Sequence, residues 1–319
     1  IMMEVRMSKN LIQFQKGVSI GSFIEDYGSE EQCRSALFVL RWPTGFQCPS
    51  CGNGTYCELS RRKELQCHKC HHQTSLTAGT IFQSTKLPLT KWFLAIYLMT
   101  QSKNGISQLE LSRQVGVSIN TAALIYHKIA QTMLERDNDK PLSGDIEADD
   151  AYWGGVKRGK RGRGSLNKTP FVAAVEKQDG KPQRIKLSVV EGFTNKSIRQ
   201  WASRSLEKGS HVRTDGLACF RMIAQAGCTH QALIVGNSRN PRKTAPFNWV
   251  NIILGNLKTA LRGTFHKLHP DHLSRHLATF SYRFNRRFQL GDMTKRFAYI
   301  ALRTPPFPRR LLTIAGQHG

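Results

Sequence analysis

One stretch gives the sequence its organisation: Ile146-Glu147-Ala148-Asp149-Asp150-Ala151-Tyr152-Trp153-Gly154-Gly155. A short run of strand length ends on two adjacent carboxylates, and an aromatic pair and two glycines follow. In an arbitrary protein such an acidic pair most often begins a solvated turn. Here it stands in a chain with 47 Lys and Arg, 22 Asp and Glu, and a formal net charge of +25. Carboxylates in so basic a setting indicate a site for metal ions beside a polyanion, if the rest of the chain supplies partners.

The composition bounds the class of protein. With 319 residues, of which 39% are hydrophobic, the chain is long enough for two or three folded domains. Positive charge along the whole length favours a nucleic-acid partner, because phosphates bind Lys and Arg with release of counterions. The longest apolar run, residues 93–99, is shorter than the roughly 20 residues of a membrane-spanning helix, and the first residues show no secretion signal. We therefore expect a cytoplasmic protein, associated with the nucleoid when bound to DNA, and no membrane partner.

Four of the eight cysteines occur as two close pairs. Cys48 and Cys51 are followed, after fifteen residues, by Cys67 and Cys70. Each pair can supply two thiolates at one turn, and a hairpin between the pairs brings them together around a tetrahedral Zn²⁺. Disulfides or chance spacing are the alternatives, and a reducing compartment disfavours disulfides. A closed set of four thiolates predicts a structural zinc; nearby residues that could substitute as ligands are Cys57, His68, His71 and His72.

Helical periodicity dominates on both sides of the cysteine pairs. Before them, apolar spacing predicts a helix over residues 22–40. Its candidate inner positions are Phe23, Ile24, Tyr27, Cys33, Leu37 and Leu40. After the pairs, Leu94, Tyr97 and Leu98 predict the apolar face of another helix.

A tight turn at residues 114–118 separates two shorter predicted helices. Gly116 suits the turn, and Ser118 can cap the helix that follows. This pattern predicts a helix-turn-helix with a recognition helix at about residues 118–129. The side chains that it offers to a DNA groove are Asn120, Thr121, His127 and Lys128. An ordinary helical hairpin has a similar pattern, but the position between a zinc ribbon and the acidic stretch favours DNA binding.

Strands alternate with helices beyond a predicted linker at residues 137–144. The expected strands are residues 146–148, 170–175, 184–190, 211–214 and 231–235, and the expected helices are 195–206, 217–226, 248–261 and 271–287. Acids end the first and fourth strands, at Asp149 and Asp215. This order matches an α/β ribonuclease H-like domain with a mixed sheet.

Two loops between these strands concentrate positive charge. Residues 157–168 contain three glycines and no acid, and residues 236–246 are again basic. Such loops suit the tracking of a phosphate backbone, and a solvated loop is the alternative. The candidate DNA-binding residues are Lys157, Arg158, Lys160, Arg161, Arg163, Arg242 and Lys243, in addition to Asn120, Thr121 and Lys128.

Taken together, these motifs resemble a known family. The cysteine ribbon, Thr214-Asp215-Gly216 and the segments 149–155, 249–258, 263–266 and 280–287 are similar to the insertion sequence 1595 family of transposases, over roughly residues 45–290. The resemblance implies a ribonuclease H-like core of the DDE superfamily, in which acidic residues hold two Mg²⁺ or Mn²⁺ ions. Carried over by motif, the first acid is Asp149, the second is Asp215, and the third position falls on Asn251.

Position 251 carries Asn where the resemblance leads us to expect a third acid. Some branches of the family are similar in carrying Asn there, with a Lys two helical turns later, and Lys258 fits that place. Two carboxylates and one amide oxygen are a workable ligand set for Mg²⁺. We expect Lys258 to contact a DNA phosphate, and a surface lysine is the alternative. Asp150 should face away from Asp149, because neighbouring residues alternate along a strand, and should cap, form an ion pair or stay solvated.

These predictions divide the chain into five segments. They are an N-terminal helical segment (1–45), the zinc ribbon (46–75), a helix-turn-helix region (85–136), the ribonuclease H-like transposase domain (144–290) and a C-terminal tail (291–319). The resemblance implies a DNA transposase of an insertion sequence. Such an enzyme binds element ends, cuts them and joins the 3′ hydroxyl to target DNA, as at least a dimer on double-stranded DNA. An inactive transposase-derived DNA-binding protein and a nuclease without strand transfer are the alternatives.

Overall fold

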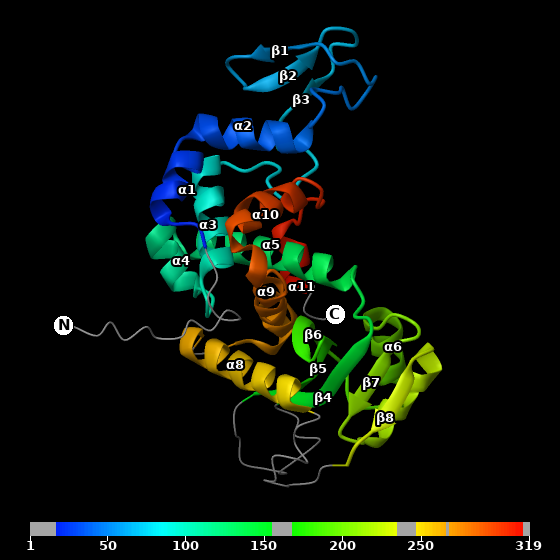
Figure 1. The fold of residues 1–319 in the computed structure, drawn as a ribbon. Coiled ribbons are helices and arrows are strands. Elements are labelled where there is room, and N and C mark those ends of the chain that lie inside the picture. The colour runs from blue at the N-terminus through cyan, green and yellow to red at the C-terminus, as the bar shows by residue number, and fades with distance from the viewer. Residues whose placement is uncertain (1–16, 155–167, 235–246, 266–267, 315–319) are drawn as a thin grey trace, which may run out of the picture. The chain divides into compact units, whose positions relative to one another are not determined.

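The computed structural model describes residues 17–154, 168–234, 247–265 and 268–314 (Figure 1). These residues belong to two compact units. The first is drawn from Ile1–Ser102, Arg113–Val117 and Arg286–Pro306, and the second from Lys103–Ser112, Ser118–Asn285 and Phe307–Gly319. Across the described ranges, no helix combines the length and the apolar character that crossing a membrane requires.

The first unit begins with two helices where the sequence pattern predicts one. Helix α1 spans Ile20–Tyr27 and α2 spans Glu30–Arg41. Ser29 and Gln32 form a capping box between them, since each side chain accepts a hydrogen bond from the other residue's backbone N–H, at 2.8 and 3.2 Å. The break is therefore encoded locally, in the Ser-x-x-Gln spacing that starts a new helix.

Burial in these helices follows the predicted pattern only in part. The predicted inner positions that are buried are Phe23, Cys33, Leu37 and Tyr97. Ile24 is 57% exposed. In α3 (Leu89–Gln101), Leu94 and Leu98 are half-buried, whereas Phe93 and Ile96 are fully buried. Apolar residues occupy most of the circumference of α3, so the three predicted apolar positions did not define its buried face.

A small antiparallel sheet follows α2 and forms the ribbon. Its strands are β1 (Tyr56–Leu59), β2 (Glu64–Cys67) and β3 (Gln73–Thr74), in the order β1-β2-β3. Phe46 and Leu65 are buried in its core, against Phe38 and Trp42. A few apolar side chains, most of them aromatic, therefore pack beside the buried cysteines of the ribbon.

The predicted C-terminal tail contains regular structure. Residues 291–319 include α10 (Met293–Ala301) and α11 (Arg309–Ile314), and η4 (Arg287–Asp292) precedes them. Met293 and Phe297 are fully buried where α10 packs against α2 and α3 in the first unit.

Two helices and a turn occupy the predicted helix-turn-helix region. Helix α4 spans Gln108–Val115, and α5 spans Ile119–Asn138. Gly116 has φ +66°, and the Ser118 side chain accepts a hydrogen bond from Thr121 N–H at 3.3 Å. The turn chemistry therefore agrees with the sequence, but α5 continues well past the expected end at residue 129.

The second unit is built on a five-stranded mixed sheet in the order β6-β5-β4-β7-β8 (Figure 1). The strands are β4 (Asp145–Trp153), β5 (Thr169–Gln178), β6 (Lys181–Val189), β7 (His211–Thr214) and β8 (Thr229–Ala232). Strands β4, β5 and β6 pair antiparallel, whereas β7 lies parallel to both β4 and β8. With the ribbon and helices that precede it, this sheet confirms the predicted fold class.

Helices cover both faces of this sheet. Ile146 and Ala148 pack in a core with α6 (Asn195–Ser205) and η1 (Ala218–Ala226). Ala151, two residues on from Asp149, packs in the opposite core with α8 (Asn248–Thr264) and α9 (Leu273–Asn285), which follows η3 (Pro270–His272). Because strand residues alternate faces, Glu147 and Asp149 belong to the face that α8 covers.

Strands β5 and β6 extend beyond their predicted ends because a tight hairpin joins them. Asp179 and Gly180 form the turn, with φ of 52° and 71°. Two positive φ values define the type I′ turn, for which Asp-Gly is a favoured pair. The turn was readable from the sequence and would have lengthened both predicted strands.

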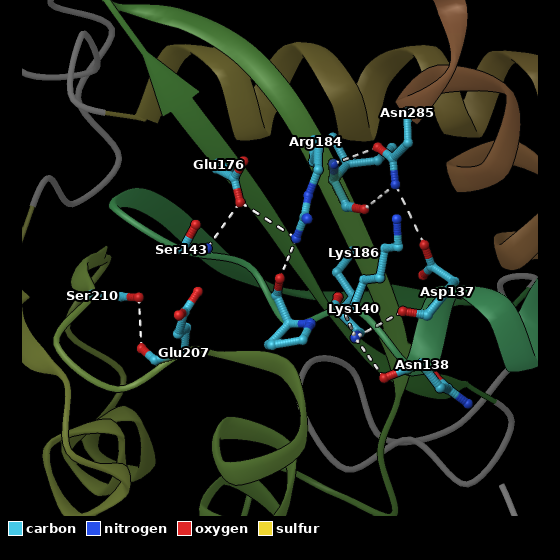
Figure 2. Close-up of polar contacts among 12 residues, drawn as sticks. Asp137, Asn138, Lys140, Ser143, Glu176, Arg184, Lys186, Glu207, Ser210 and Asn285 are labelled. Atoms are coloured by element: carbon cyan, nitrogen blue, oxygen red, sulfur yellow. Dashed lines mark hydrogen bonds and ion pairs between the residues drawn. The ribbon is translucent and has the colours of Figure 1, made fainter.

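The predicted linker at residues 137–144 is held firmly against the sheet. Lys186 of β6, only 2% exposed, donates to the backbone carbonyls of Asp137, Asn138 and Lys140 at 3.0, 3.5 and 3.2 Å (Figure 2). Burial lowers the pKa of Lys186, while carbonyl oxygens at the end of α5 stabilise its ammonium. Arg184 also donates to the carbonyl of Pro141. This segment is thus an anchored connection.

Asn285, at the end of α9, closes the outer edge of β6. Its Oδ1 accepts from Ile185 N–H at 2.7 Å, and its Nδ2 donates to the Ile185 carbonyl at 2.9 Å (Figure 2). The amide pairs with the edge strand as a neighbouring strand residue would, which satisfies both backbone groups of Ile185.

A buried polar cluster lies between α5 and α9. His276 Nδ1 lies 2.9 Å from the Tyr126 hydroxyl, and the rings of His127 and His272 are 4.5 Å apart. Burial, followed by the neighbouring imidazoles and Arg275, lowers the pKa of both His127 and His276 to about 3. Contrary to the expectation that it faces a DNA groove, His127 is half-buried and bonded to Gln108 at 3.0 Å.

From the lowered pKa values of these two imidazoles we predict that the second unit loses stability in mild acid. They are neutral when folded, but in the unfolded chain they bind protons below a pKa of about 6.5. The unfolded state binds more protons between about pH 6.5 and 3, so the free energy of unfolding should fall with pH there, by about 2 kcal/mol per imidazole at pH 5. Urea unfolding at pH 7.5 and 5.0 measures the change. The double variant His127→Gln/His276→Gln should depend less on pH, and an unchanged dependence would contradict this account.

Candidate functional site

Two parallel strands bring acidic residues together in the middle of the sheet. The β4–β7 ladder sets Glu147 opposite Arg213. Two residues further along the same register, Asp149 is level with Asp215, which directly follows the end of β7. Carboxylate oxygens of Asp149, Asp150 and Asp215 all lie within 4.8 Å of one another, and all three residues are half-buried. The structure therefore brings both predicted acids into one group.

Asp150 also joins this group, although we expected it to face away. Pairing between β4 and β7 ends at Glu147, three residues before Asp150. Its carboxylate lies within 4.8 Å of those of Asp149 and Asp215, and its backbone N–H donates to Asp149 Oδ1 at 2.8 Å. Alternation along the strand therefore did not decide which acids share this group.

The turn after β7 fixes the place of Asp215. Gly216 has φ +89°, and a Cβ there would lie 3.0 Å from the Ile234 side chain, so this turn requires glycine. Asp215 Oδ1 accepts from Leu217 N–H at 3.2 Å. The Thr214 hydroxyl lies 2.9 Å from His230 Nε2. In the Thr-Asp-Gly motif, Thr214 ends the strand, Asp215 supplies the acid and Gly216 turns the chain.

Helix α8 carries the remaining predicted catalytic residues. Asn251 is exposed near its start, and Lys258 is half-buried seven residues later. The preceding residues, Trp249 and Val250, each donate a backbone N–H to Glu147 Oε2, at 3.0 Å. Glu147 has no role among the residues predicted from the sequence. A carboxylate at a buried position of a strand, two residues before Asp149, was the available signal.

The acidic group suits a hard divalent cation. Three carboxylate oxygens within 4.8 Å repel one another, and a divalent cation between them offsets that repulsion. Carboxylate and amide oxygens are the ligands that Mg²⁺ and Mn²⁺ prefer. The residues present therefore fit the metal that the sequence predicts.

The four ribbon cysteines suit zinc equally well. Their Sγ atoms lie within 4.8 Å of one another, with 3.5 Å between Cys48 and Cys70 and 3.6 Å between Cys51 and Cys67. Tetrahedral Zn–S bonds of about 2.3 Å require sulfur separations of roughly 3.8 Å. Hydrogen bonding, first from the Cys70 backbone N–H, lowers the pKa of Cys67, which favours the thiolate that zinc binds. Among the described residues, this group contains neither Cys57 nor a histidine.

The other candidate DNA-binding residues are less informative. Asn120 is exposed at the start of α5, Thr121 is half-buried, and burial lowers the pKa of the half-buried Lys128. The predicted loop residues lie outside the described ranges: Lys157, Arg158, Lys160, Arg161, Arg163, Arg242 and Lys243.

Comparison with known proteins agrees with this architecture. A ribbon with four clustered cysteines precedes a mixed sheet with clustered carboxylates. Residues 141–285 match the ISXO2-like transposase domain, and residues 28–73 match the transposase zinc-ribbon domain, both of IS1595 type. Over these two segments, the chain matches the IS1595 family of transposases.

Two further likenesses accompany the family matches. The chain is 30% identical over 144 residues to an uncharacterized protein in transposable element ISH50 of Halobacterium salinarum. That match covers 44% of this chain and 46% of the relative, so it spans less than half of the relative's length. A crystal structure of a pre-cleavage Mos1 transpososome is similar at 10% identity and a TM-score of 0.20, over 60% of this chain and 76% of that one. This second likeness is too slight to bear on fold or function.

The cysteine geometry predicts one zinc ion per chain. Cys67→Ser should lose it and lower the melting temperature of the ribbon, because binding of a structural metal contributes to folding. Cys57→Ser is the matched control, since Cys57 is an exposed cysteine of the same ribbon outside the group. Elemental analysis of the purified proteins measures zinc, and thermal circular dichroism measures stability. Full zinc content in Cys67→Ser would refute the assignment.

The acidic group predicts a binding site for Mn²⁺. Asp149→Asn, Asp150→Asn and Asp215→Asn should each weaken Mn²⁺ binding by more than about tenfold, since even residues behind the ligands commonly contribute that much. Isothermal titration calorimetry on the whole protein measures the affinities. Asp179→Asn is the control, because it is an exposed turn residue and Asn tolerates its positive φ. An unchanged affinity in Asp150→Asn would remove that residue from the site.

Proposed function

We propose that this protein is a DNA transposase that binds the ends of its element, cuts them and joins the freed 3′ hydroxyl to target DNA. The single observation that carries the proposal is the group formed by Asp149, Asp150 and Asp215 within a transposase domain. Its place beside the end of β7 leaves the carboxylates half-buried, so a substrate phosphate can approach them.

Each catalytic role belongs to a named residue. Asp149 and Asp215, with the amide oxygen of Asn251, would hold Mg²⁺ or Mn²⁺, and Asp150 adds a carboxylate beside them. Two such ions, when bound, relieve charge on the attacking and leaving oxygens of a phosphodiester. Lys258 presents an ammonium on the same helix as Asn251, suited to a DNA phosphate near the scissile bond.

Double-stranded DNA is the proposed partner, both as element end and as target. A formal net charge of +25 favours a polyanion, and α8 contains Lys258 and Arg262 but no acid. Joining two element ends requires that they be held together, so the proposed working form on DNA is at least a dimer.

A transposase-derived protein that binds DNA without cutting it is the second candidate. Asn251 is the specific observation in its favour, because an amide binds a divalent ion more weakly than a carboxylate does. The ribbon and helix-turn-helix region would serve either function equally.

A cleavage assay separates the two functions. With Mn²⁺ or Mg²⁺, wild type should nick duplexes that contain an element end and join them to a target plasmid. Asp149→Asn and Asp215→Asn should lower the nicking rate by at least about a hundredfold while retaining DNA binding, since they remove groups that act in the transition state. Asp179→Asn again serves as control. DNA binding by wild type without any metal-dependent cutting would favour the second candidate, and nicking without joining would indicate a nuclease.

A further inference from the structure

Glu147 has a geometry that the proposed chemistry does not use. It is 1% exposed on β4, two residues before Asp149. Its Oε2 accepts the backbone N–H groups of both Trp249 and Val250, at 3.0 Å each. A strand residue thus serves as the cap for a helix that begins 101 residues later in the sequence, at Asn248.

Helix α8 depends on this remote cap, because its own sequence supplies none. Phe247 occupies the N-cap position and makes no side-chain hydrogen bond there, and the first turn contains no acid. The first N–H groups of a helix otherwise lack partners, and a carboxylate there also interacts favourably with the helix dipole. The indole Nε1 of Trp249 adds a second anchor, donating to the carbonyl of Gly180 at 2.7 Å.

An ionic network adjoins the Glu147 side chain. Its Oε1 lies 3.1 Å from Lys177 Nζ, which lies 3.1 Å from Asp145 Oδ2. Asp145 in turn pairs with Arg213 at 3.2 Å. Both carboxylate oxygens of Glu147 therefore have partners, so Glu147 is not a substitute for the acid that is missing at position 251.

We propose that Glu147 is a positioning residue, which fixes the start of α8 to the acidic strand. It thereby sets Asn251 and Lys258 in register with Asp149 and Asp215. Asn251 directly follows the two residues that Glu147 binds, and Asp149 lies two residues beyond Glu147 on the same face of β4. This role rests on the proposed function for its effect on cutting, while the anchoring of α8 is a structural property that can be measured separately.

Three variants test the proposal. Glu147→Ala removes both hydrogen bonds to α8. Glu147→Gln retains an oxygen that can accept from both N–H groups but loses the ion pair with Lys177. Asp145→Ala, the matched control, breaks the same ionic network without removing the cap. Hydrogen exchange of the amides of Trp249 and Val250 reports anchoring, and kcat and KM for metal-dependent nicking of end-containing DNA report positioning.

The expected results differ among the variants. In Glu147→Ala, protection of the two amides should fall about tenfold, as for loss of a helix cap, with protection of the β4 amides retained. The same variant should lose about a hundredfold in kcat with KM unchanged, the effect of displacing a catalytic group by about 1 Å. Glu147→Gln should recover most of both, and Asp145→Ala should resemble wild type.

Three results would overturn the proposal. The first is unchanged amide protection in Glu147→Ala, which would show that other contacts hold α8. The second is an equal loss of kcat in Asp145→Ala and Glu147→Ala, which would attribute the loss to general destabilisation. The third is no recovery in Glu147→Gln, which would attribute the loss to the charge of Glu147. If wild type itself does not cut DNA, the proposed function fails, and the exchange measurement still decides whether Glu147 anchors α8.

Discussion

The hydrogen bonds from α8 to the Glu147 carboxylate are the contact on which the second unit's site depends. A carboxylate with 1% exposure is costly unless its oxygens find donors, and this one has two backbone N–H groups and the Lys177 ammonium. The same contact satisfies the start of a helix that has no cap of its own. Strand and helix therefore stabilise each other, because neither group could be buried so well alone.

The parallel pairing of β4 with β7 imposes a second constraint. This ladder is short, extending from Asp145 to Glu147. Two residues beyond its end, Asp149 and Asp215 are level, and the Asp150 carboxylate lies close to both. The acidic site thus arises from a sheet that ends early, with a glycine at position 216 that turns the chain away.

Local patterns predicted much of this architecture, and tertiary contacts account for most of the rest. Periodicity and turn chemistry gave the order of strands and helices, and the cysteine spacing gave the ribbon. The capping box at Ser29 and the turn at Asp179 were equally local and readable. By contrast, two features depend on residues distant in sequence. One is the burial of His127 where α5 packs against α9, and the other is the set of hydrogen bonds from Lys186 to carbonyls at the end of α5. Periodicity carries no information about which distant element will cover a given face.

The cluster geometry also changes how Asn251 should be understood. From the sequence, an amide at the third position leaves a site with two carboxylates. In the structure Asp150 is the third carboxylate of the group, and α8 contributes none of the three. An acid at position 251 would bring another negative charge to the helix that starts beside Glu147, where four carboxylates already occur between Asp145 and Asp150. A neutral oxygen donor there adds a ligand and no further repulsion, so Asn251 is chemically consistent with a site whose charge comes from the strands.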